Sequence, residues 1–190
     1  YLMPVAERRR ALMRIDWVRD ASVSRRWPNR VDVRIYERTP VAFAMLPQSR
    51  DASGTVRYEA ALVDGEGIIL TPPPRARFNL PVLYGLTRQQ PVQVRRERVQ
   101  QVLELIGEVK SHTGQISEID AADRDNLIVT YNVEGRAVRL MLGHQRYLPR
   151  LKSFLANYAE ISRRLPGARL FDLRLDDRIT AVEEGGSDAR

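Results

Sequence analysis

The side chains that most often do chemistry are sparse in this sequence. His112 and His144 are its only histidines, and neither has a second ligand at the spacing of a known metal motif. There are no cysteines, which excludes both a thiolate metal site and a disulfide framework. The acidic cluster at residues 120–125 lacks the oxygen spacing of a calcium loop, so a solvated loop explains it better.

Phosphate-binding and nucleophile motifs are also missing. Residues 63–68 read VDGEGI, which lacks the glycine spacing that brings backbone N–H groups to a phosphate, so a hairpin turn accounts for them. No GxSxG motif presents a serine nucleophile. We therefore predict that the chain is not an enzyme and that it binds no cofactor and no metal.

The net charge of +7 comes largely from residues 1–50, which hold 11 basic and 5 acidic side chains. Such an end is attracted to nucleic acid or to anionic lipid headgroups. Trp27 and Tyr36 lie near the arginines, as a base-stacking surface requires, but no RRM, KH or helix-turn-helix motif accompanies them. A nucleic-acid-binding or membrane-surface-binding module is the alternative function, and a solvated arginine-rich face is the simplest explanation.

The elements that would position these residues begin with a small helix–hairpin unit. Residues 5–15 have apolar side chains at helical spacing after a proline, and residues 17–27 read as a strand. After a Pro-Asn turn, residues 31–36 alternate between apolar and polar side chains, and Pro40, which has no N–H, ends that strand. This unit is too thin to bury a core, so we expect elements upstream of Tyr1 to be missing.

The remaining chain is predicted to be mostly β. Residues 45–55 have the composition of a loop, and residues 58–70 read as a hairpin. Two amphipathic helices are expected at residues 96–110 and 147–165. Further strands are expected at residues 116–119, 127–133, 137–142, 170–175 and 178–182, and residues 184–190 form a polar tail that we expect to be disordered.

The last predicted strand, residues 178–182, suggests a third class of function, the interaction module. If it lies at a sheet edge, its free N–H and C=O groups can pair with a strand of another chain. If it lies between two strands, or if the tail covers it, those groups are already used. The sequence leaves both arrangements open.

Several short motifs, in this order, resemble the FtsQ/DivIB family of bacterial division proteins. IDWVRDASVSRRWPNRVDVRIYERTPVAF, residues 15–43, resembles the second half of the family's POTRA domain through Trp17, Val18, Ala21, Val23, Arg25, Pro28, Val33, Glu37, Arg38, Pro40, Val41 and Ala42. The later motifs are Leu62-Val63-Asp64 with Gly67, LPVLYG at 80–85, VRLMLG at 138–143 and Asp172-Leu173-Arg174. The resemblance covers about residues 10–183.

The resemblance implies an α+β fold in three segments. Residues 1–43 would be the C-terminal part of a truncated POTRA unit, a helix plus a β-hairpin. Residues 44–183 would be a mostly antiparallel β domain with two long amphipathic helices, and residues 184–190 the tail. It also implies a single transmembrane helix outside this sequence, in the bacterial inner membrane, with this region on the periplasmic side at the division septum.

The function implied by the resemblance is that of a non-enzymatic divisome scaffold that recruits septal peptidoglycan synthesis. Its partners would be FtsB-like and FtsL-like proteins, with other divisome components binding through the POTRA unit. In the family the FtsB-like partner adds a strand to the C-terminal sheet edge. The positions carried over are Arg174, Leu175, Asp177, Arg178, Ile179, Thr180, Ala181 and Val182, with Arg124 as a further basic position.

Three departures from the family pattern concern side-chain anchors. Leu175 stands where relatives have an aromatic residue, Asp177 and Arg178 stand where relatives have a serine–glycine pair, and Glu183 stands where relatives have a tryptophan. Strand addition depends on backbone groups, so these differences leave that mode of binding intact.

Overall fold

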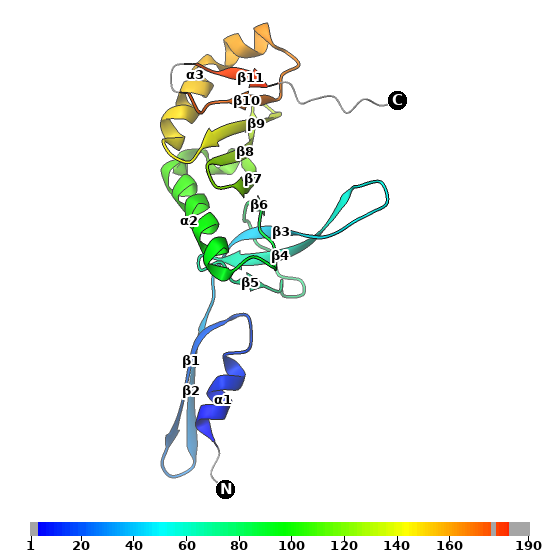
Figure 1. Ribbon diagram of the computed structural model, residues 1–190. Coiled ribbons are helices and arrows are strands. Elements are labelled where there is room, and N and C mark those ends of the chain that lie inside the picture. Colours follow the sequence, from blue (N-terminus) through cyan, green and yellow to red (C-terminus); the bar gives the residue numbers. More distant parts are fainter. Residues whose placement is uncertain (1–3, 176–177, 183–190) are drawn as a thin grey trace.

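The computed structural model describes residues 4–175 and 178–182, which form two parts joined at residues 38–40 (Figure 1). The first part is a helix and a β-hairpin. The second is a large, mostly antiparallel sheet with two long helices on one face. The predicted α+β class, with a truncated POTRA unit followed by a β domain, is confirmed.

The N-terminal unit contains α1 (Val5–Leu12), β1 (Val18–Arg26) and β2 (Arg30–Glu37). β1 and β2 form a two-stranded antiparallel sheet, and α1 packs against β1. The guanidinium of Arg9 connects the two elements, since Nε donates to the Ala21 carbonyl (2.6 Å) and Nη2 to the Asp20 carboxylate (2.9 Å). Because α1 packs mainly against β1, the apolar face of β2 remains about half exposed.

The second sheet has nine strands among the described residues, in the order β11-β10-β9-β8-β7-β6-β3-β4-β5. They are β3 (Pro40–Arg50), β4 (Val56–Asp64), β5 (Ile69–Leu70), β6 (Val82–Tyr84), β7 (Ile116–Asp123), β8 (Asn126–Val133), β9 (Arg136–Gly143), β10 (Leu170–Asp172) and β11 (Thr180–Val182). The helices are α2 (Val92–Glu108) and α3 (Tyr147–Arg164), and a 3-10 helix, η1 (Lys110–Gln115), follows α2.

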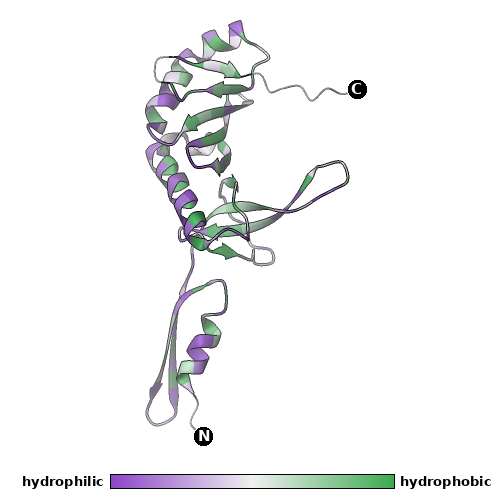
Figure 2. Ribbon diagram, in the orientation of Figure 1, coloured by the Kyte–Doolittle hydropathy of each residue, from purple (hydrophilic) through white to green (hydrophobic). Residues whose placement is uncertain are grey.

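Two crossover connections explain why both long helices lie on the same face. α2 connects the parallel neighbours β6 and β7, and α3 connects the parallel neighbours β9 and β10. Parallel strands need such a crossover, and its hand is nearly always right-handed, so successive crossovers that advance in the same direction cover the same face. Hydrophobic and hydrophilic residues alternate along both helices in Figure 2, as amphipathic elements require.

The core lies between this face and the helices. Strand residues at alternate positions are fully buried there, including Leu83, Ile119, Leu140 and Phe171, and they meet buried residues of the helices such as Phe154. Burying a side chain of this size contributes about 1.5–3 kcal/mol. The period-2 strands and amphipathic helices predicted from the sequence therefore share one core.

One predicted loop is wrong. Residues 45–55 were expected to be irregular, but β3 continues to Arg50 and β4 begins at Val56, so the turn spans only residues 51–55. This distal part of the hairpin extends beyond the rest of the sheet (Figure 1). Residues 47–50 are exposed on both faces, which explains their polar composition, whereas Leu46 is buried in the core. Backbone pairing such as Pro47 opposite Tyr58 maintains the strands.

The junction between the two parts is fixed by polar contacts. Arg38 Nη1 donates to the buried Asp64 carboxylate at 2.7 Å, and the Trp17 indole N–H donates to the Thr71 carbonyl at 2.8 Å. Pro40 is the first residue of β3, a strand position that needs no N–H. The predicted domain boundary after residue 43 thus falls inside β3.

Candidate partner-binding edge

β10 and β11 form the end of the sheet that carries the predicted site residues Thr180, Ala181 and Val182, while Arg174, Leu175, Arg178 and Ile179 lie between the two strands. β10 runs parallel to β9, and β11 pairs antiparallel with β10, with Phe171 opposite Ala181. Within the part of the chain that the structure describes, no strand pairs with the other side of β11. β11 is therefore the last strand of the sheet among the described residues, while the tail, which the sequence left as a possible cover, lies outside them.

Apolar packing explains why these short strands form. Phe171 and Leu173 are each 2% exposed, and the Phe171 ring lies 5.2 Å from the ring of Phe154 in α3. Ile179 and Ala181 are partly buried against the same core. Packing against α3 and the core therefore holds one face of β10 and β11 in place and sets the orientation of both strands.

The ladder between β9 and β10 shows which way the backbone groups of β10 point. The Arg139 N–H donates to the Arg169 carbonyl (2.6 Å), and the Leu173 N–H donates to the Met141 carbonyl (3.0 Å). Backbone groups alternate in direction along a strand, so residues 169, 171 and 173 face β9. The two residues between them face β11.

The free groups of β11 follow from this alternation. Leu170 lies opposite Val182, and Asp172 lies opposite Thr180. Residues that face each other in this way in an antiparallel ladder exchange both of their hydrogen bonds. Thr180 and Val182 therefore bond to β10, and the N–H and C=O of Ala181 point to the open edge.

Arg150, which the sequence reasoning missed, connects the edge to the rest of the domain. Its Nη1 donates to the carbonyls of Leu142 (2.6 Å) and Gln145 (2.9 Å), and its Nη2 donates to the Arg174 carbonyl (2.7 Å). Gly143 leaves room for this side chain, because a Cβ there would lie 2.8 Å from Arg150 Nη1. Gly143 also has φ +73°, and its place in the VRLMLG motif was the only sequence signal of this contact.

Arg174 forms a two-pronged ion pair with Asp172. Its Nε lies 2.9 Å from Asp172 Oδ1, and its Nη2 lies 2.6 Å from Oδ2. Hydrogen bonds from the Arg174 side chain hold the pKa of the Asp172 carboxyl below its usual range, although partial burial opposes this. The same pairing raises the pKa of Arg174. Arg174 is thus a fixed cation beside the edge.

A groove of about 610 Å³ lies next to the edge, between α3 and the segment that follows β10. Its apolar lining comes from Pro149, Ile161, Leu165, Leu173, Leu175 and Ile179. Its charged lining comes from four arginines and one glutamate, namely Arg146, Arg150, Arg164, Arg178 and Glu160. A segment with apolar and acidic side chains matches such a groove.

The predicted site residues occupy different positions relative to this groove. Leu175 is half exposed and Arg178 is exposed, and both line the groove with Ile179. Asp177 lies outside the described residues. Arg124 lies in the turn between β7 and β8, where it pairs with Glu97 of α2 at 3.9 Å, so three strands separate it from β11.

Neither histidine belongs to a cluster of metal-ligand side chains among the described residues. His112 Nδ1 lies 3.2 Å from the Tyr131 hydroxyl, and His144 is exposed. No group of three or more His, Asp or Glu side chains within residues 4–175 and 178–182 is arranged to hold a metal ion. None of the helices described is both long and apolar enough to cross a bilayer.

The fold and this edge define a class of protein: a POTRA-type unit joined to a β domain whose last strand lies at a sheet edge. Residues 2–38 match the model of the FtsQ-type POTRA domain, and residues 54–174 match that of the C-terminal domain of the cell division protein FtsQ/DivIB. The chain therefore belongs to the FtsQ/DivIB family of cell division proteins.

Two curated relatives have the same name, cell division protein FtsQ. The protein of Koribacter versatilis is 26% identical over 185 residues, which cover 94% of this chain and 50% of the relative. The protein of Zymomonas mobilis subsp. mobilis is 40% identical over 75 residues, 39% of this chain and 21% of the relative. This chain thus spans half or less of the relatives that it matches.

Proposed function

We propose that this chain is a non-enzymatic scaffold of the division machinery that binds another division protein by strand addition at β11. The observation that carries the proposal is the open edge at Ala181, whose N–H and C=O have no partner strand among the described residues. Family membership supplies the partners, an FtsB-like protein at the edge and an FtsL-like protein associated with it. Binding of these partners would help to recruit septal peptidoglycan synthesis.

The edge and the groove contribute differently to partner binding. Backbone groups of β11 give affinity for any extended segment, which is the usual basis of strand addition. The groove supplies selectivity, because its arginines favour a partner with carboxylates and its leucine and isoleucine side chains favour apolar residues. A short edge strand also limits unwanted pairing, since three residues alone offer few hydrogen bonds.

The proposal places the region outside the cell membrane at the septum. In this arrangement the whole protein is anchored in the inner membrane by a segment outside this sequence. The POTRA unit then lies between the anchor and the β domain, and the contacts of Arg38 and Trp17 transmit its orientation to the sheet.

Calorimetry with the extracytoplasmic segment of the FtsB-like protein from the same genome tests the proposal. Ala181→Pro removes the outward N–H of β11 and should weaken binding about tenfold to a hundredfold, the value of one or two lost hydrogen bonds. The thermal stability of the free chain should change little, because that N–H does not bond to β10.

Thr180→Pro is the matched comparison. It removes an N–H that bonds to β10, so it should lower the stability of the free chain as well as partner affinity. Equal binding by the Ala181→Pro variant and the unchanged chain, with both folded, would refute strand addition at this edge.

A further inference from the structure

The tip of the β1–β2 hairpin presents a tryptophan to solvent. Trp27 is 90% exposed, the highest value among the large hydrophobic side chains of the described residues. It lies in the turn between Arg26 and Arg30, which are opposite each other in the register. A single exposed apolar side chain is common at protein surfaces, so the meaning of this one depends on the residues around it.

The charge around this tip is strongly positive. Residues 4–38 contain ten arginines and five acidic residues, a net charge of +5. Two of those carboxylates are already engaged, Asp20 by Arg9 and Asp32 by Arg26, each at 2.9 Å. Asp16 accepts a hydrogen bond from the Thr71 N–H at the junction with the β domain, far from the tip. The unit therefore keeps a net positive charge, although Arg9, Arg26 and Arg38 are held in ion pairs.

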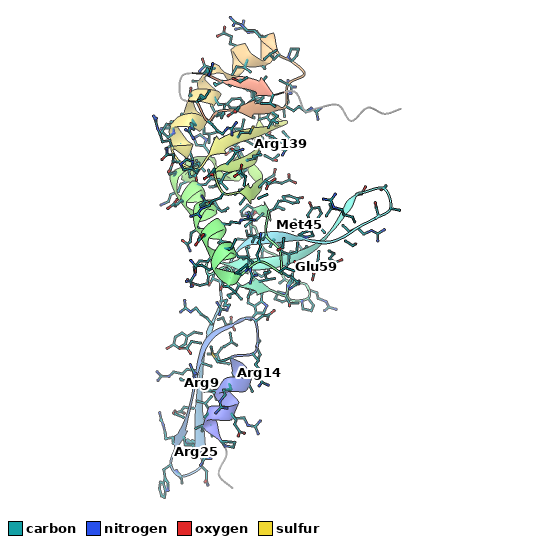
Figure 3. The ribbon with its side chains drawn as sticks, in the orientation of Figure 1. Arg9, Arg14, Arg25, Met45, Glu59 and Arg139 are labelled. Atoms are coloured by element: carbon teal, nitrogen blue, oxygen red, sulfur yellow. The ribbon has the colours of Figure 1, made fainter. Side chains whose placement is uncertain are left out.

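These features gather at one end of the molecule. The hairpin tip and the beginning of α1 lie together at the end opposite the nine-stranded sheet (Figure 1). Figure 3 shows Arg25 beside the tip, and Arg9 and Arg14 further along toward the β domain. The tip is therefore free to approach a flat surface without interference from the β domain.

We propose that this tip docks on an anionic phospholipid surface, with Trp27 in the headgroup layer and Arg30 bonded to a lipid phosphate, within the positive field of the unit. Tryptophan favours the interface between water and hydrocarbon, because its ring is apolar and its N–H can bond to headgroups. Arginine matches a phosphate with two parallel hydrogen bonds. Each arginine near such a surface strengthens binding about fivefold.

The arrangement of aromatic side chains favours lipid over nucleic acid. A single-stranded nucleic acid needs successive aromatic rings along a basic groove. Tyr36, the other aromatic residue of this hairpin, lies opposite Asp20 at the far end of β2, six residues beyond Arg30 at the tip. The tip instead has one protruding ring, with the half-exposed Val31 and Val33 behind it, as insertion into a headgroup layer requires.

Vesicle binding by this chain tests the proposal. Trp17→Phe makes Trp27 the only tryptophan, since the sequence has two, so its fluorescence reports the tip alone. Vesicles with equal amounts of phosphatidylcholine and phosphatidylglycerol should bind the chain, shift the emission to shorter wavelength and lose affinity as salt rises. Vesicles of phosphatidylcholine alone should bind far more weakly. Brominated acyl chains should quench Trp27.

Substitutions distinguish binding through the hairpin tip from binding through the overall positive charge of the chain. Arg30→Gln should weaken vesicle binding about fivefold, and Trp27→Ser about tenfold, without changing the melting temperature. Arg57→Gln, which removes the same charge from an exposed position of β4, is the matched control and should have little effect. The proposal is overturned if anionic vesicles are not bound, or if the Arg57 and Arg30 variants bind equally. The proposal is also overturned if Trp27 fluorescence shows that a single-stranded oligonucleotide binds the chain more tightly than anionic vesicles do at the same salt concentration.

Discussion

Asparagine in place of Asp64 should loosen the junction between the POTRA unit and the β domain. Asp64 is 3% exposed, and its Oδ2 lies 2.7 Å from Arg38 Nη1. Its Oδ1 accepts the N–H groups of Glu66 (2.9 Å) and Ile68 (2.8 Å), which closes the turn after β4. The substitution retains the turn contacts, because asparagine still offers one oxygen, but it presents an NH2 group to the Arg38 guanidinium.

The expected loss follows from the burial of the pair. Removing one member of a buried ion pair costs about 3–5 kcal/mol. Because the Arg38 side chain is 16% exposed, water can solvate part of its unpaired charge. We therefore expect the free energy of unfolding to fall by an amount at the lower end of this range, about 3 kcal/mol. For a chain of this length that corresponds to a melting temperature lower by about 6–12 °C.

Thermal and urea unfolding followed by circular dichroism measure this loss, and Asp51→Asn provides the control. Asp51 also accepts two backbone N–H groups in a turn, those of Ser53 (3.0 Å) and Thr55 (2.9 Å), but it is exposed. Its substitution should cost much less than that of Asp64, because water can replace its contacts. If Asp64→Asn costs no more than Asp51→Asn, or if its effect simply adds to that of Arg38→Gln, the assigned role of the pair is wrong.

Two further predictions concern the edge of the sheet. Because Arg174 lowers the pKa of Asp172, the stabilising ion pair is fully present above the carboxyl's usual pKa and is lost as pH falls through the lowered folded-state value. Asp172→Asn should therefore be less stable at neutral pH and lose less stability on acidification, as urea unfolding at several pH values would show. Gly143→Ala should destabilise by about 1–2 kcal/mol, because φ is +73° and the added Cβ displaces Arg150. Gly107→Ala in α2, where nothing lies within 4 Å, should stabilise by about 0.5–1 kcal/mol, and the opposite order in thermal melts would contradict this assignment.

Much of the fold could be predicted from periodicity in the sequence. The helix ending at Glu108 and the helix from Tyr147 to Arg164 carry apolar stripes, and the strands of the hairpin between Asn126 and Gly143 alternate cleanly. Residues 47–50 could not be predicted, because a strand exposed on both faces has no apolar alternation to detect. The parallel pairing of β6 with β7 and β9 with β10 also went unpredicted, since it depends on how the helices cross the sheet.

The last strand of the sheet was predictable from the sequence, but its place in the sheet was not. The strand of residues 178–182 was correctly expected at the C-terminal end of the domain, but sheet order decides whether it is an edge, and sheet order is a tertiary property. Arg150 looks like any other arginine in the first turn of a helix. Its three carbonyl partners come from segments that meet only after folding, so no local pattern could reveal them.

Amide hydrogen exchange at β11 tests most directly whether this edge receives a partner strand. In the free chain the amides of Thr180 and Val182 should be protected by their bonds to β10, while the Ala181 amide exchanges quickly. Addition of the FtsB-like segment should slow exchange at Ala181. An Ala181 amide that is already protected in the free chain, or that still exchanges quickly when the segment is bound, would contradict the account.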